Sequence, residues 1–144
     1  MIAHEFHHNV LFKNTDWNFM NDVTVAKYLA IEGLAESFAK SMYGYKFLGR
    51  WVKDLSGEEL DKTRKIIGRA LSVKGFNEVR KYIFGDQLLD YEDMESTGIP
   101  RSGGYAVGYH AVQAFLEKTG MSVEEATLLE GEEIIEKSGY FNKL

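Results

Sequence analysis

Ala3-His4-Glu5-Phe6-His7-His8, close to the start of the chain, decides the expected fold and chemistry of this 144-residue protein. Within it, His4, Glu5 and His8 form an H-E-x-x-H pattern. Residues four apart on a helix lie on one face, so the imidazoles of His4 and His8 can bind a single metal ion. Glu5 lies between them and can reach a water molecule bound to that ion. The pattern therefore predicts a helix that supplies two ligands of a zinc site.

Outward from this motif, the chain is predicted to be helical nearly throughout. It has one proline, Pro100, and no sustained alternation of apolar and polar residues of the kind that strands show. The first helix is expected over 2–12, and the second runs from a cap at Asn21 or Asp22 to Tyr43. A third helix begins at a capping box of Ser56 and Glu59, and a shorter one covers 76–84. The next helix runs from Tyr105 to Gly120, and a final helical pair begins at a capping box of Ser122 and Glu125. An ordered surface loop is expected over 85–104, and Phe6 is expected in the core. The predicted fold class is mainly α.

Composition limits the possible functions. With 17 basic and 22 acidic side chains the net charge is -5, and no basic cluster is present, which argues against a nucleic-acid partner. Cysteine is absent, so disulfides and thiolate ligands are excluded and any metal must be held by His, Glu or Asp. No apolar run is long enough to cross a bilayer and no export signal is evident, which predicts a cytoplasmic protein without a membrane partner.

A catalytic zinc site needs a third protein ligand and leaves one position open for water. Glu32 and Glu36, in Ile-Glu-Gly-Leu-Ala-Glu, lie one turn apart on the second expected helix, and either carboxylate could face the metal if that helix folds back on the first. The adjacent Gly33 favours this interpretation over a solvated helical face. A glycine inside a helix costs about 1 kcal/mol relative to alanine, and close approach of another element is the usual compensation.

The combination of H-E-x-x-H with Glu-Gly-Leu-Ala-Glu resembles the gluzincin metallopeptidases, and more closely the YjaZ-like family of zinc-dependent proteases. The matching pieces are residues 3–8, 32–38, 82–86 and 104–110, which are spread over most of the chain. The resemblance implies a zincin-like catalytic helical domain in which Glu32 is the third zinc ligand. Glu36 then accepts a hydrogen bond from a zinc-bound imidazole, or is the alternative ligand.

The resemblance also implies a β-sheet upstream of the motif helix, whose edge strand pairs with an extended substrate. This chain offers no residues for such a sheet before His4. We therefore expect residues 1–144 to form a single helical metallopeptidase-like domain that is the C-terminal part of a longer protein. Association into a homo-oligomer would be another way to cover the open face.

The expected activity is hydrolysis of a peptide or protein substrate by zinc-activated water, with Glu5 as the general base. A hydrogen-bond donor for the developing oxyanion would help, and Tyr105, Tyr109 and His110 are the candidates. The two tyrosines also fit a packed helix face, so His110, near glycine-rich backbone, is the preferred donor. His7 points away from the face shared by His4 and His8 and is expected not to bind the metal, nor are Asp22 and Asp86.

Two other classes of protein fit parts of the pattern. A carboxylate-bridged di-iron bundle needs Glu-x-x-His twice, but Val107 stands three residues before His110, so the second copy is missing. The remaining alternative is a non-catalytic helical module that binds zinc for structure or binds a protein partner. A structural zinc fills all four positions with protein ligands, so a fourth protein ligand would favour this alternative.

Overall fold

The computed structural model describes residues 2–15 and 22–142, and within these ranges the chain is built from helices with no strand. The mainly α fold class is therefore confirmed. None of the helices in the described ranges combines the length and apolar composition of a membrane span. The elements are α1 (Ile2–Asn14), α2 (Val25–Tyr43), η1 (Tyr45–Phe47), α3 (Arg50–Asp54), α4 (Gly57–Gly68), α5 (Phe76–Phe84), η2 (Gly85–Asp90), α6 (Gly103–Thr119), α7 (Val123–Ala126) and α8 (Gly131–Ser138).

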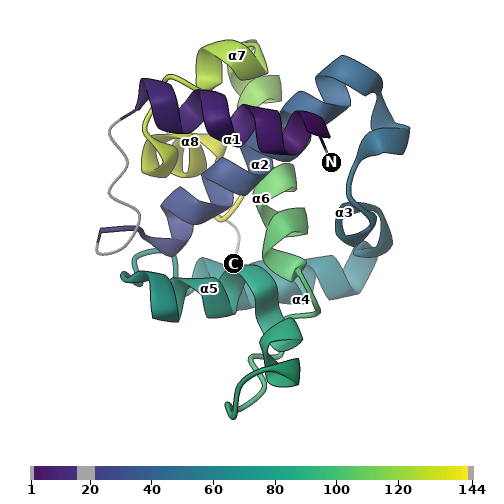
Figure 1. The fold of residues 1–144 in the computed structure, drawn as a ribbon, viewed down its shortest axis with the longest axis vertical. Coiled ribbons are helices and arrows are strands. Elements are labelled where there is room, and N and C mark those ends of the chain that lie inside the picture. Colours follow the sequence, from purple (N-terminus) through teal and green to yellow (C-terminus); the bar gives the residue numbers. More distant parts are fainter. Residues whose placement is uncertain (1, 16–21, 143–144) are drawn as a thin grey trace.

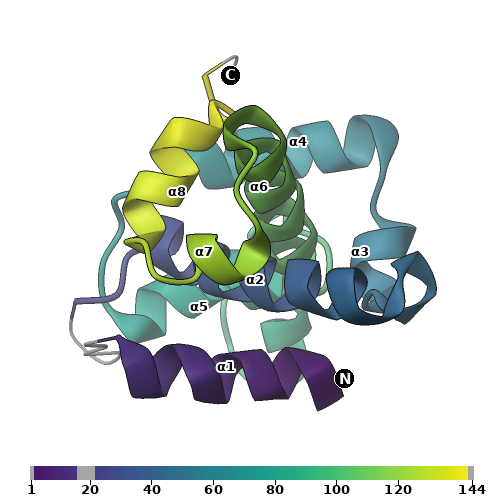
Figure 2. The same cartoon turned by 90° about the horizontal axis from the view of Figure 1, so that it is seen from above.

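Helix α2 lies at the centre of the structure. Its buried residues include apolar positions such as Leu29 and Leu34 and also two carboxylates, Glu32 and Glu36. Helix α1 packs across one side of α2 and runs in the opposite general direction, while α6 crosses another side (Figures 1 and 2). This arrangement brings the H-E-x-x-H helix against the helix that carries both candidate third ligands.

Two glycines allow α2 and α6 to cross at very short range. A Cβ atom built at Gly33 would lie 2.2 Å from the carbonyl oxygen of Gly108, and one built at Gly108 would lie 2.4 Å from the carbonyl oxygen of Leu29. In both cases the new Cβ atom would meet a backbone oxygen of the other helix, so the rotation of a side chain could not relieve the contact. The close approach predicted from Gly33 is therefore present, and the approaching element is α6.

We expect Gly33→Ala to lower the free energy of unfolding by about 2 kcal/mol. Overpacking costs roughly 3 kcal/mol here, and the better helix propensity of alanine returns about 1 kcal/mol. Chemical denaturation of both proteins would measure the difference. Ser41→Ala, at an exposed position near the end of the same helix, is the control and should change stability by less than about 0.5 kcal/mol. Equal stability of Gly33→Ala and the parent protein would contradict the close crossing.

The helix caps agree with the sequence only in part. Ser122 and Glu125 form the expected capping box at the start of α7. The cap of α2 is Thr24, whose hydroxyl accepts a hydrogen bond from the backbone N–H of Lys27, so the expectation of a cap at Asp22 is wrong; Asn21, the other candidate, lies outside the described residues. Ser56 occupies the position before α4 but makes no side-chain cap hydrogen bond. Caps depend on the dihedral angles of one residue, which short sequence patterns predict poorly.

The segment between α5 and α6, expected as an ordered loop, begins with the 3-10 helix η2 and continues as loop to Pro100. The carboxylate of Asp86 stabilises this segment by hydrogen bonds within it. It accepts one from the Ser96 hydroxyl at 2.5 Å and one from the Thr97 backbone N–H at 2.7 Å. These bonds hold the pKa of Asp86 below its usual value, although partial desolvation acts in the opposite direction. Asp86 thus orders this loop.

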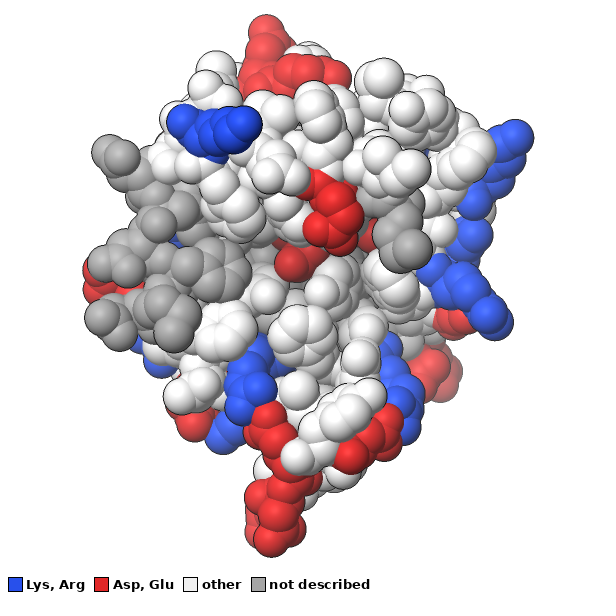
Figure 3. Space-filling model, in the orientation of Figure 1, with Lys and Arg blue, Asp and Glu red and all other residues white. Residues whose placement is uncertain are grey.

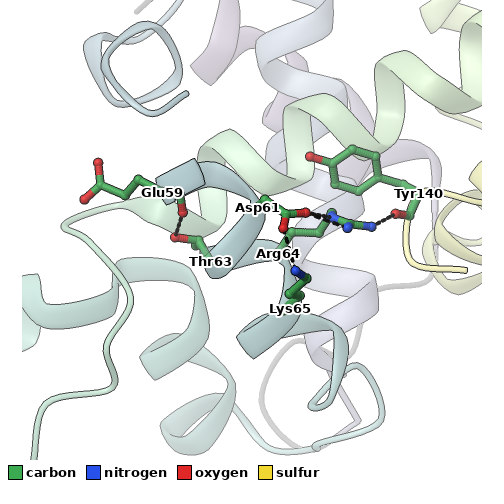
Figure 4. A network of polar contacts seen from close by, with 6 residues as sticks. All are labelled: Glu59, Asp61, Thr63, Arg64, Lys65 and Tyr140. Carbon is green, nitrogen blue, oxygen red and sulfur yellow. Dashed lines mark hydrogen bonds and ion pairs between the residues drawn. The ribbon is translucent and has the colours of Figure 1, made fainter. Parts of the chain in front are cut away.

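A polar network joins α4 to the segment after α8 (Figure 4). The guanidinium of Arg64 donates to the carboxylate of Asp61 at 2.6 Å and to the backbone carbonyl of Tyr140 at 2.8 Å. Lys65 pairs with the other oxygen of Asp61 at 2.7 Å. The network holds Tyr140 and the segment that follows α8 against α4, on the far side of α2 and α6 from α1 (Figure 2).

Candidate metal centre

Three donor atoms from α1 and α2 converge in the interior. The Nε2 atoms of His4 and His8 lie 3.0 Å apart, and Oε2 of Glu32 lies 3.0 Å from the first and 3.3 Å from the second. In the part of the chain that the structure describes, these three residues are the group whose donor atoms could hold one metal ion, all within 4.8 Å of one another. The structure thus brings together the residues that the sequence proposed as ligands.

The donor set fits a zinc ion. Two imidazole nitrogens and one carboxylate oxygen are ligand types of catalytic zinc sites. Oε2 of Glu32 is buried and accepts no well-oriented hydrogen bond, although both imidazoles are close to it. A buried carboxylate oxygen without a hydrogen bond is costly, and a cation between the three atoms would compensate it.

Glu36 lies beside the cluster and faces the other nitrogen of His4. Its Oε1 is 3.1 Å from Nδ1 of His4, at an angle unsuited to a hydrogen bond but close enough for a strong charge interaction. Its Oε2 accepts a hydrogen bond of 3.0 Å from the backbone N–H of Gly49. Glu36 therefore contacts the side of the His4 imidazole that faces away from the cluster. It also joins α2, through a hydrogen bond, to the segment that leads into α3.

The charges in the cluster depend on one another. Burial by itself would lower the pKa of His4, but the carboxylates of Glu32 and Glu36 outweigh burial and raise it from 6.5 to about 9. Burial would raise the pKa of Glu32, but the two imidazoles hold it below its usual value. Without a metal ion, His4 is therefore protonated near neutral pH, and its positive charge offsets the negative charges of Glu32 and Glu36. A bound cation could supply this positive charge instead.

Glu5 and Tyr105 lie at the edge of the cluster, facing a common cavity of about 350 Å³. Glu5 is exposed on α1. The Tyr105 ring, on α6, has its centre 6.3 Å from that of His4. Burial, followed by the charge of Glu32, raises the pKa of Tyr105 above its usual value, so its hydroxyl stays protonated and can donate. Acidic atoms border a hollow just below α1, seen on the face drawn in Figure 3.

The other two candidate oxyanion donors point elsewhere. Tyr109 is buried against Leu48 and Val52. The ring of His110 stacks on Tyr140 with 6.4 Å between ring centres and contacts Tyr109 edge-on at 5.2 Å. His110 follows Tyr105 by five residues, so it projects from another face of α6, and the contacts described for it do not include the cluster. The structure therefore favours Tyr105 over His110, the reverse of the sequence-based preference.

His7 and Phe6 have environments that their positions in the sequence did not reveal. His7 is buried, and its Nε2–H donates to the hydroxyl of Thr127 at 2.8 Å, because that hydroxyl itself donates to the carbonyl of Val123. Burial, together with the charges of His8 and His4, lowers the pKa of His7 to about 4, so it stays neutral. Phe6 is 57% exposed, and the expectation that it lies in the core is wrong. It stacks on the outer side of Phe38 instead, with 6.3 Å between ring centres.

The residues that complete the cavity wall were missed in the sequence. One group comes from η1, α3 and the link between them: Phe47, Leu48 and Trp51. The other comes from the end of α5, from η2 and from the residue before α6: Phe84, Gln87 and Ser102. Both groups come from short helices and loops that lack a long hydrophobic period, so no sequence pattern brings them together. The hydrogen bond between Gly49 and Glu36 is the contact that positions the first group.

Comparison with known proteins shows the family to which the chain belongs. The model of a family described as "Predicted Zn-dependent protease (DUF2268)" matches residues 1–136, and the chain belongs to that family. The chain is also 44% identical, over 142 residues, to the uncharacterized protein YjfC of Bacillus subtilis (strain 168). The match covers 99% of this chain and 47% of YjfC, so the chain spans about half the length of this curated relative. No solved structure gave a significant match. The resemblance to the YjaZ-like family of zinc-dependent proteases is thereby confirmed.

Proposed function

We propose that this chain carries the catalytic centre of a zinc-dependent peptidase, with His4, His8 and Glu32 as zinc ligands and a peptide or protein as substrate. The observation that carries the proposal is the convergence of two imidazole Nε2 atoms and one carboxylate oxygen within 3.3 Å of one another beside an open cavity. Membership of a family of predicted zinc-dependent proteases supports it.

The other residues have separate roles in this proposal. A bound zinc ion would supply Lewis acidity, polarising the substrate carbonyl and bringing the pKa of bound water to about 7. Glu5, exposed at the cavity edge, takes the proton of the attacking water and returns it to the leaving amine. Tyr105 donates its hydroxyl hydrogen to the developing oxyanion. Glu36 interacts with Nδ1 of His4 and so orients the imidazole with Nε2 toward the zinc site.

A purely structural zinc site is the alternative, and the arrangement of Glu36 argues against it. A structural zinc takes four protein ligands, whereas among the described residues only three donor atoms converge. Glu36 is the nearest further carboxylate, but its oxygens face Nδ1 of His4 and the N–H of Gly49. A zinc ion held by these three residues would therefore keep a position for water or substrate.

The direct test is zinc content together with hydrolysis. The purified chain should hold about one zinc per molecule by atomic emission and should degrade fluorescein-labelled casein. The zinc chelator 1,10-phenanthroline should abolish that activity, and added zinc should restore it. A protein loaded with one zinc that hydrolyses no peptide or casein would reject the peptidase proposal and favour the non-catalytic zinc-binding module. A protein that binds no zinc at saturating concentration would reject both.

Zinc affinity should depend steeply on pH. Because the pKa of His4 is about 9 in the metal-free site, a proton must leave this imidazole before it can bind zinc at neutral pH. The apparent affinity should therefore rise about tenfold per pH unit between pH 7 and 9 and level off above that. Competition with a chelator of known affinity at each pH would measure it. An affinity that does not change over this range would contradict the charge assignment of His4.

A further inference from the structure

The cavity beside the metal centre has two chemically different sides. His4, Glu5 and Glu36 form the polar side next to the metal centre, whereas Phe47, Leu48, Trp51 and Phe84 form an apolar side. The polar residues Arg50, Gln87 and Ser102 also line the cavity. Tyr105 lies between the two sides. Its ring centre is 6.3 Å from that of His4, 5.3 Å from that of Trp51 and 6.0 Å from that of Phe84. The apolar side therefore begins one aromatic ring away from a candidate zinc ligand.

The apolar side is partly open to solvent. The side chain of Phe47 is 49% exposed and that of Trp51 is 36% exposed. Exposed aromatic side chains that gather around a hollow are typical of binding sites, because their large apolar area is available to a ligand. The volume of about 350 Å³ lies at the lower end of the range of ligand sites and suits one side chain with its adjoining backbone.

The backbone around this cavity is held in place by specific contacts. The N–H of Gly49 donates a hydrogen bond to Glu36, and Glu36 also contacts His4. Glu36 therefore connects the segment that carries Trp51 to the metal centre. Across the cavity, Ser102 has φ 55°, and within residues 2–15 and 22–142 it is the one non-glycine residue with positive φ. Its hydroxyl donates to Oε1 of Gln87 at 2.8 Å. Residues with strained backbone angles are concentrated at active sites and ligand-binding sites, which fits the position of Ser102 in the wall of this cavity.

We infer that this cavity is a specificity pocket that receives a large apolar side chain, aromatic or leucine-like, of the substrate residue next to the scissile bond. The inference rests on the proposed peptidase function. The apolar wall would make van der Waals contact with such a side chain while its backbone lies against Glu5 and the metal centre. A charged side chain placed against Phe47, Trp51 and Phe84 would lose hydration, which these apolar rings cannot replace.

The pocket should discriminate between substrates that differ at one residue. We would first map cleavage sites in a random peptide library by mass spectrometry, and then compare a Phe and an Ala peptide at the preferred position. The parent protein should favour the Phe peptide in kcat/KM by about 10-fold to 100-fold, the effect of burying one aromatic side chain. Equal kcat/KM for the two peptides would overturn the inference.

Variants of the wall separate a specificity role from a structural one. Trp51→Ala should lower kcat/KM for the Phe peptide about 10-fold more than for the Ala peptide, so that the Phe-to-Ala preference falls by about 10-fold. Trp51→Phe should keep most of the preference. In Gly49→Ala the new Cβ would lie 2.3 Å from Cε2 of Trp51, so the ring must move and the preference should fall although no lining side chain is removed. Equal losses for both peptides in Trp51→Ala would overturn the inference.

A binding measurement distinguishes failure of the pocket from failure of the proposed function. The sequence has two tryptophans, so Trp17→Phe leaves Trp51 as the single tryptophan, whose emission can be excited apart from that of the tyrosines. We expect its emission to change saturably on titration with N-acetyl-phenylalaninamide and to stay constant with N-acetyl-alaninamide. A response without hydrolysis of any peptide supports the pocket and rejects the peptidase. Hydrolysis without residue preference and without a response rejects the pocket and leaves the peptidase intact.

Discussion

Glu5→Gln is expected to leave the zinc content of the chain unchanged and to lower its peptidase activity by about 10²-fold to 10⁴-fold, the usual contribution of a general base. Glutamine keeps the size of the side chain but cannot take a proton from water. Glu5 is exposed and is not one of the three converging donors, so the metal centre should persist without it. Zinc content by atomic emission and casein hydrolysis on the same sample would measure both effects.

The control for this variant is Glu58→Gln, which removes one exposed carboxylate from the first turn of α4 and leaves the site untouched. It should keep both zinc and activity. Full activity in zinc-loaded Glu5→Gln would show that another group serves as the base. Loss of zinc in Glu5→Gln would instead place Glu5 among the ligands, contrary to the geometry.

Replacement of the two buried glutamates should have unequal effects on zinc binding. Oε2 of Glu32 faces Nε2 of both histidines, whereas Glu36 approaches Nδ1 of His4. Removal of an outer partner of a zinc-bound histidine costs about 10-fold to 100-fold in affinity, so Glu36→Gln should weaken zinc by that amount. Glu32→Gln removes a ligand and should weaken zinc further, leaving less than one zinc per chain after dialysis.

The glutamine variants are preferred because both carboxylates are buried and truncation to alanine would leave cavities as well. A chelator titration would give both affinities, and circular dichroism would check that each variant is folded. If Glu36→Gln lost zinc and Glu32→Gln kept it, the third ligand would be Glu36. If neither variant changed the affinity, α2 would contribute no ligand and the proposed centre would be wrong.

The sequence by itself determined those features that depend on local helical geometry. His4 and His8 share a face because they are four residues apart, and this spacing holds wherever the helix packs. Glu32 and Glu36 likewise had to lie one turn apart, and Gly33 marked a close helix crossing that the structure contains. The helical class followed from periodicity and from the near absence of proline, and it is confirmed.

Tertiary structure alone decided which side chains meet. It turned Tyr105 toward His4 and His110 toward Tyr140, exposed Phe6, and brought Trp51 to the cavity through the bond between Gly49 and Glu36. Such contacts join residues far apart in the chain, and they depend on how whole helices cross and on where short segments are held. Helical periodicity gives the direction of a side chain relative to its own axis, whereas the neighbour it meets depends on the packing of the other helices.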